Sequence, residues 1–70
     1  NFEIHLELGK VLEKEKRWDE AIATYQRAIN LNPDCSLAHQ HLGDALAEHG
    51  QLHEASVSYR RVLQLQVKSC

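Results

Sequence analysis

The sequence has 70 residues with 10 acidic and 8 basic side chains, which gives a formal net charge of −2. A chain of this length buries only about 60% of the surface that its unfolded form exposes, so little material remains for the walls of a catalytic pocket. The acidic balance provides no basic face for nucleic acid, and the apolar runs are too short to span a membrane. The first residue is Asn1 rather than Met, so we expect a piece of a longer protein.

The sequence repeats itself at a spacing of 34 residues, which brings nine pairs of identical residues into register. A repeat of this length is typical of stacked repeat architectures. The identical pairs are His5/His39, Leu8/Leu42, Gly9/Gly43, Leu12/Leu46, Glu20/Glu54, Ala21/Ala55, Tyr25/Tyr59, Arg27/Arg61 and Leu31/Leu65. We therefore expect repeat one at residues 2–35 and repeat two at residues 36–69.

Apolar residues at steps of three and four predict two amphipathic helices in each repeat. In chain order, the helices are expected near residues 3–15, 19–31, 37–49 and 53–67. The connections are short, so consecutive helices should pack antiparallel. The side chains expected to be buried are Leu8, Leu12, Ala21, Tyr25, Leu42, Leu46, Ala55 and Tyr59.

The residues at the turns predict where the helices end, and two glycines inside helices predict close packing. Gly50 suits a left-handed residue at the end of the third helix, and Lys16 occupies the equivalent place in repeat one. Lys16 should either share that backbone at a cost or avoid it through a distorted turn. Pro33 should stop the second helix, and either Asp34 or Ser36 should cap the third. The glycine pair at positions 9 and 43 costs about 1 kcal/mol of helix propensity each, which indicates close approach of a neighbouring helix.

The last helix lacks the stop signals of the second, since Val67 replaces Pro33 and each Asn nearby has become Gln, a good helix former. We therefore expect this helix to continue to about Lys68. Its outer side carries apolar residues such as Val57 and Leu63. We therefore expect another copy of the chain or a swapped helix to cover it, which would give a homo-oligomer through the C-terminal helix.

Cysteine, histidine and serine give no sign of catalysis or of a cofactor. Cys35 and Cys70 are expected to be free thiols in a cytoplasmic setting, because two cysteines are too few for a disulfide framework. Cys35 and His39 have a workable pair spacing, but a structural zinc site needs four ligands, so we expect no metal site. No nucleophile or phosphate-binding motif surrounds the serines and glycines, and we expect a protein that is not an enzyme.

The repeat resembles the tetratricopeptide repeat. The first copy reads His5-x-x-Leu8-Gly9-x-x-Leu12, then Ala21-x-x-x-Tyr25 and Pro33, and the second reads His39-x-x-Leu42-Gly43-x-x-Leu46, then Ala55-x-x-x-Tyr59 and Val67. His and Leu stand at the two places where that family carries aromatic residues on the first helix. The resemblance implies an all-α fold, in which two antiparallel helix-turn-helix repeats stack as a segment of a right-handed α-solenoid.

The resemblance also implies a function, namely binding of a peptide or a partner protein in a concave groove lined by the first helix of each repeat. The groove positions, expected on the exposed face of each first helix, are Glu3, Leu6, Glu7, Lys10, Glu13 and Lys14, then Leu37, Gln40, His41, Asp44, Ala47 and Glu48. The residues expected to contact the peptide are Leu6, Lys10, Gln40, His41 and Asp44. A subgroup of the family clamps a terminal carboxylate with Lys and Asn, but only Lys10 matches here, so that clamp is not carried over.

The groove is mixed and slightly acidic, which suits a mixed or basic peptide. An RNA-binding helical repeat is the alternative, although such an array should carry a basic groove, and here acidic residues offset Lys10 and Lys14. A structural or self-associating segment of a larger enzyme is a further alternative.

Overall fold

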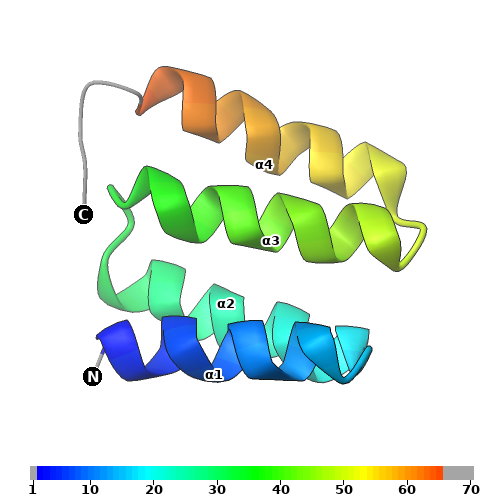
Figure 1. Cartoon of the computed structure of the whole chain (residues 1–70). Coiled ribbons are helices and arrows are strands. Elements are labelled where there is room, and N and C mark those ends of the chain that lie inside the picture. The colour runs from blue at the N-terminus through cyan, green and yellow to red at the C-terminus, as the bar shows by residue number, and fades with distance from the viewer. Residues whose placement is uncertain (1, 66–70) are drawn as a thin grey trace.

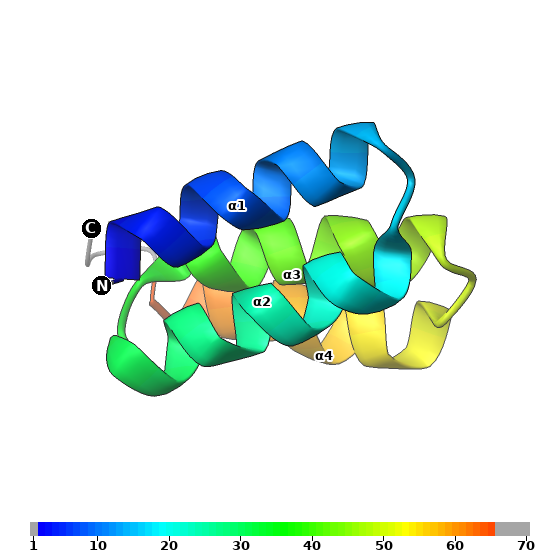
Figure 2. The ribbon, with the colours of Figure 1, turned by 90° about the horizontal axis from the view of Figure 1, so that it is seen from below.

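The computed structural model describes residues 2–65, and they fold into helices without strands. The helices are α1 (Phe2–Lys14), α2 (Trp18–Leu31), α3 (Ser36–Glu48) and α4 (Leu52–Gln64). Each helix packs on the next in the chain, whereas α1 and α3 make few contacts. Figure 1 shows α1 and α2 at one end of the stack and α4 at the other, and Figure 2 shows α1 and α2 side by side. The predicted all-α fold of two helix-turn-helix repeats is confirmed.

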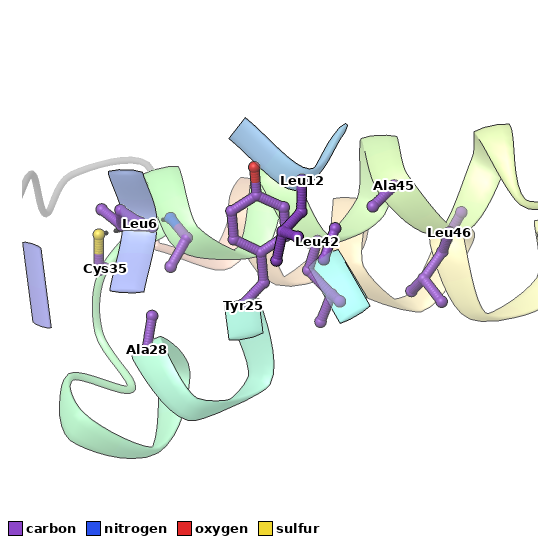
Figure 3. Close-up of a cluster of buried hydrophobic side chains, with 11 residues drawn as sticks. Leu6, Leu12, Tyr25, Ala28, Cys35, Leu42, Ala45 and Leu46 are labelled. Atoms are coloured by element: carbon purple, nitrogen blue, oxygen red, sulfur yellow. Dashed lines mark hydrogen bonds between the residues drawn. The ribbon is translucent and has the colours of Figure 1, made fainter. Parts of the chain in front are cut away.

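The core lies where α2 meets α1 and α3. Tyr25 of α2 is fully buried and stands among leucines and alanines contributed by the helices on both sides of it (Figure 3). Ala38 and Ala45 of α3 are also fully buried. Because an alanine side chain ends at Cβ, these two positions allow α2 to approach α3 closely.

The two mid-helix glycines make room for tyrosine rings, as their positions predicted. A Cβ atom added to Gly9 would lie 2.7 Å from Cζ of Tyr25, and one added to Gly43 would lie 2.8 Å from Cε1 of Tyr59. Both separations are below van der Waals contact. The same glycine–tyrosine contact therefore joins the two helices of each repeat.

Two of the eight side chains expected to be buried are exposed, so the prediction was wrong at Leu8 and Tyr59. Leu8 is 48% exposed, whereas its repeat partner Leu42 is buried beneath α2. Tyr59 is 38% exposed, whereas its partner Tyr25 is buried between α1 and α3. In the described chain, no helix covers the outer side of α1 or of α4, so identical residues have different surroundings at the ends of the stack.

The two inner turns have the expected left-handed backbone. Lys16 has a φ of 61° and Gly50 has a φ of 92°. The N–H of Arg17 donates to the carbonyl of Leu12, and that of Gln51 donates to the carbonyl of Leu46. The same turn is therefore formed in both repeats, although only one has a glycine at the position that requires it.

Replacement of Lys16 by Gly is expected to raise the free energy of unfolding by up to about 1 kcal/mol, because it removes the steric cost of a side chain at positive φ. Gly50→Lys is the matched control, since it introduces that cost into the second repeat, where a Cβ would meet no other atom. Urea denaturation followed by circular dichroism measures both changes. Equal stability of Lys16→Gly and wild type would contradict the strain assigned to this turn.

The cap of α3 and the end of α4 differ from the predictions. Cys35, rather than Asp34 or Ser36, is the N-cap of α3, and its Sγ accepts a hydrogen bond from the N–H of Ala38 at 3.4 Å. Ser36 is already the first helical residue, and Asp34 lies one position too early. The Cys35 side chain is fully buried and belongs to the core cluster drawn in Figure 3, so the cap is part of the core.

Helix α4 ends at Gln64, so the expectation that it continues to about Lys68 was wrong. The N–H of Leu65 is shared between the carbonyls of Arg61 and Val62, which tightens the last turn, and the Leu65 side chain is buried. Helix propensity is a weak preference that tertiary packing overrides, and here burial of Leu65 accompanies the end of the helix. Lys68 itself lies outside the described residues.

Cys35 is disulfide-bonded, so the expectation of a free thiol was wrong for this residue. Its side chain is fully buried at the start of α3. The other cysteine of the sequence, Cys70, lies outside the described residues.

Candidate functional site

The first helices of the two repeats, α1 and α3, make few contacts with each other, and we call the surface that they share the concave face. Two hollows open along this seam, and we call them the N-terminal and the C-terminal hollow. The N-terminal hollow has a volume of about 430 Å³ and is lined by Phe2, Glu3, Ile4, Leu6, Glu7, Lys10 and Leu37. The C-terminal hollow has a volume of about 500 Å³ and is lined by Lys10, Glu13, Lys14, Trp18, Asp44, Ala47, Glu48 and Tyr59. Lys10 lines both, so the two hollows form one continuous surface.

The structure brings together part of the predicted peptide-contacting set. Lys10 and Asp44 both line the C-terminal hollow, one from α1 and the other from α3. His41 stacks on the ring of Tyr25 with ring centroids 5.5 Å apart. Gln40 is exposed on α3, outside both hollows. Leu6 lines the N-terminal hollow but is only 7% exposed, so the prediction that it lies on an exposed face was wrong.

Two tyrosine hydroxyls hold carboxylates at the concave face. The hydroxyl of Tyr25 donates to Glu13 of α1, and that of Tyr59 donates to Asp44 of α3, each at 2.5 Å. Hydrogen bonds to an ionised acceptor are short and strong. Each tyrosine thus fixes an acidic side chain on the neighbouring helix of its own repeat, and Glu13 and Asp44 both border the C-terminal hollow.

The sequence missed Trp18 and Tyr59 as parts of this surface, because they belong to α2 and α4 rather than to the groove helices. Trp18 begins α2 immediately after the first turn, which places it at the edge of the C-terminal hollow. Tyr59 reaches the same hollow past Gly43. The glycine–tyrosine pairing in the repeat was the available signal, since a ring passing a glycine reaches the far side of the helix.

Carboxylates dominate the charge of the two hollows. The acidic residues are Glu3, Glu7, Glu13, Asp44 and Glu48, and the basic residues are Lys10 and Lys14. Lys10 also forms an exposed ion pair with Glu7 at 3.8 Å. The surface therefore attracts cations, and the partly exposed rings of Trp18 and Tyr59 add aromatic surface to the C-terminal hollow.

The tyrosine–carboxylate bonds predict a loss of stability at alkaline pH. Burial and the hydrogen bond to Glu13 raise the pKa of Tyr25 far above its ordinary value of 10.0. The hydrogen bond to Asp44, followed by burial, raises the pKa of Tyr59 to about 12. Since the folded state holds these protons more tightly than the unfolded chain, their stabilisation is complete below pH 10 and is lost as the pH rises through the folded-state pKa values.

We therefore expect the melting temperature to change little between pH 7 and 9 and to fall steadily above about pH 10, where unfolded tyrosine begins to ionise. Tyr25→Phe should be less stable at neutral pH but should show a shallower decline above pH 10. Thermal melts followed by circular dichroism measure the profile, with Tyr59→Phe as the matched variant. A decline of the same slope in wild type and Tyr25→Phe would contradict this assignment.

A third hollow lies on the opposite, convex side, where α2, α3 and α4 meet. It has a volume of about 420 Å³ and is lined by Gln26, Ile29, Asn30, His39, Leu42, Val57, Ser58 and Arg61. We call it the convex hollow. It has one basic side chain and no carboxylate, so it differs chemically from the concave face and provides a reference surface for binding experiments.

The described residues contain no group of three or more metal-binding side chains. Cys35 is disulfide-bonded, and Nε2 of His39 donates to the carbonyl of Pro33 at 3.0 Å, so the Cys35–His39 pair is engaged in structural contacts. Within residues 2–65, no helix has the length and apolar character needed to cross a membrane.

Comparisons with known proteins identify the repeat. The family described as TPR repeat matches residues 14–50, and the family described as tetratricopeptide repeat matches residues 37–66. The chain is also 36% identical over 63 residues to the protein O-mannosyl-transferase Tmtc1 of Drosophila melanogaster, an alignment that covers 89% of this chain. The chain spans only 7% of the length of that relative.

Proposed function

Because the chain belongs to the tetratricopeptide repeat family, whose repeats generally mediate protein–protein interactions, we propose that its concave face binds a basic segment of a partner protein. The observation that carries the proposal is the continuous surface of the N-terminal and C-terminal hollows, in which carboxylates outnumber lysines. A peptide lying along the seam between α1 and α3 would contact both repeats at once.

The side chains of the C-terminal hollow have complementary tasks in this proposal. Asp44 and Glu48 would pair with Lys or Arg of the bound segment, and Trp18 would support the aliphatic part of that side chain. Tyr59 holds Asp44 in place before binding, which lowers the entropic cost of forming the complex. Lys10, at the junction of the two hollows, would pair with an acidic or carbonyl group of the segment.

Gln40 and His41 would extend the contact along α3. Gln40 is exposed and can offer both a donor and an acceptor to a peptide backbone. His41 is half-buried, and its stack on Tyr25 fixes the orientation of its ring. Leu6 would supply apolar surface at the floor of the N-terminal hollow rather than an exposed contact.

The relative is by its name an O-mannosyl-transferase, and this chain matches a small part of it. We propose that the chain serves as a partner-binding repeat region and that any catalytic activity of such a protein resides in other parts of it. The acidic concave face disfavours the alternative of RNA binding, since phosphates would meet Glu13, Asp44 and Glu48.

The cytoplasmic setting stays a prediction, and the disulfide of Cys35 argues against it. Disulfides form and persist in oxidising compartments and are rare in the cytosol. Alkylation of the denatured chain directly after cell lysis in acid measures the redox state of Cys35. A modified Cys35 without prior reduction would support the cytoplasm, and modification only after reduction would support an oxidising compartment.

Selection from a phage-displayed library of random short peptides tests the binding proposal. We expect enriched peptides to carry Lys or Arg, and Asp44→Asn should weaken their binding about fivefold, as loss of roughly 1 kcal/mol from a partly exposed ion pair implies. Asparagine keeps an acceptor for Tyr59, so the fold should be unaffected. Glu54→Gln removes one negative charge outside both hollows and is the matched control.

The selection also has results that would overturn the proposal. Enrichment of acidic or purely apolar peptides, or equal weakening by Asp44→Asn and Glu54→Gln, would show that the concave face does not recognise a basic segment. Binding of single-stranded RNA that weakens steeply with salt would favour the RNA alternative instead.

A further inference from the structure

We propose that copies of this chain associate head to tail, with the outer face of α4 in one copy packed against the outer face of α1 in the next. The α4 face consists of Leu52, Ser56, Tyr59 and Leu63, and the α1 face consists of Ile4, Leu8 and Val11. All seven residues are exposed. The two faces lie on helices at opposite ends of the stack, as Figure 1 shows, so one copy presents both halves of the interface.

The contact between α2 and α3 inside the chain shows what covers such faces. In the 34-residue register, the α4 face corresponds to Trp18, Ile22, Tyr25 and Ile29 of α2, and the α1 face corresponds to Ala38, Leu42 and Ala45 of α3. These counterparts pack together in the core. The α4 face of one copy and the α1 face of another are therefore the two sides of an interface that the chain already forms once.

The sizes of the side chains on the two faces change in opposite directions. On α4, Ser56 replaces the larger Ile22, whereas on α1, Val11 replaces the smaller Ala45. Likewise, Leu52 of α4 replaces the larger Trp18, and Ile4 of α1 replaces the smaller Ala38. Packed interfaces tolerate substitutions best when the total side-chain volume is conserved. The smaller side chains of the α4 face would offset the larger side chains of the α1 face if the two faces packed against each other.

A carboxylate and a histidine at the edge of the interface exchange places between the two helices. Within the chain, Asp19 at the start of α2 lies 3.1 Å from Nε2 of His49 at the end of α3. The equivalent residues are His53 at the start of α4 and Glu15 after α1, so the carboxylate and the imidazole have changed sides. A second copy would thus restore a carboxylate–histidine pair with the opposite polarity.

A second copy is the occupant that these observations favour over an unrelated partner, because size and charge are matched between two surfaces of the same chain. The interface is heterologous, since different faces meet, so association does not close at a dimer but continues into a chain of copies. We therefore expect the average mass to rise with concentration rather than to reach a plateau at two copies.

Analytical ultracentrifugation of the wild type and of two variants tests the proposal. Leu63→Glu disables the α4 face, and Leu8→Glu disables the α1 face; both positions are exposed, so folding is preserved and can be checked by circular dichroism. Each variant alone should remain monomeric at concentrations where the wild type associates. An equimolar mixture should form dimers and nothing larger, because only one intact α4 face can meet one intact α1 face.

Three results would overturn the proposal: a wild type that stays monomeric up to millimolar concentration, a Leu8→Glu variant that associates as strongly as the wild type, or a mixture that stays monomeric. The second result would indicate symmetric pairing of two α4 helices. Lys10→Ala, at the concave face, should leave the average mass unchanged, so failure of the head-to-tail interface and failure of peptide binding are measured independently.

Discussion

Replacement of Tyr25 by alanine is expected to leave the chain largely unfolded at room temperature. The side chain is fully buried, fills the space above Gly9, bonds Glu13 and stacks on His41. Truncation of a buried aromatic residue to alanine costs about 3–5 kcal/mol. A single core in a chain of this size rarely supplies more than about 3–5 kcal/mol, so the loss is comparable with the whole stability.

Tyr59→Ala is the matched control, because it makes the same chemical change at the same repeat position. Tyr59 is partly exposed and bonds Asp44 at the surface, so its removal should cost only about 1–2 kcal/mol. Far-UV circular dichroism and urea denaturation measure both variants. Equal costs for the two changes would contradict the difference in burial between Tyr25, inside the stack, and Tyr59, at its end.

The second large effect is expected from the small residues of α3. Ala38→Ile and Ala45→Val together give α3 the residues that α1 carries at the equivalent places, and α2 would have to move away from them. Insertion of extra methyl groups into a packed core costs about 1–3 kcal/mol at each site, so the double change should cost roughly 2–6 kcal/mol. Thermal and urea unfolding measure the loss.

The reverse exchange on α1 is the control for this prediction. Ile4→Ala and Val11→Ala remove exposed side chains and should change the free energy of unfolding of the monomer by less than about 0.5 kcal/mol. The same double variant should weaken head-to-tail association, since both residues belong to the α1 face. Tolerance of the enlarged α3 residues without loss of stability would contradict the tight α2–α3 contact.

Much of the fold could be predicted from the sequence because the repeat register reports on contacts that both copies share. Gly9 and Gly43 lie against tyrosine rings, and Lys16 adopts the left-handed backbone of its counterpart Gly50. The register could not predict burial at Leu8 and Tyr59, because identical residues meet different neighbours at the ends of a stack. Identity between two repeats does not indicate whether a neighbouring helix covers a given residue.

The remaining errors have local physical causes. The end of α4 was misjudged because helix propensity is a weak preference even for a good helix former such as glutamine, and burial of Leu65 accompanies the earlier end. Cys35 was overlooked as a cap because sulfur is a poor acceptor and capping preferences favour oxygen. The sequence predicted a groove along α1 and α3, and residues of these helices line both hollows, but Trp18 and Tyr59 reach the C-terminal hollow from other helices.

The most direct test of the account is an NMR titration of the isotope-labelled chain with a basic peptide obtained by the library selection. We predict that the largest amide shift changes fall on the concave face, at Lys10, His41 and Asp44. Residues of the convex hollow, such as Asn30 and Arg61, should show little change. Shift changes concentrated at Asn30 and Arg61, with the concave face unaffected, would contradict the central claim that the groove between α1 and α3 binds the partner.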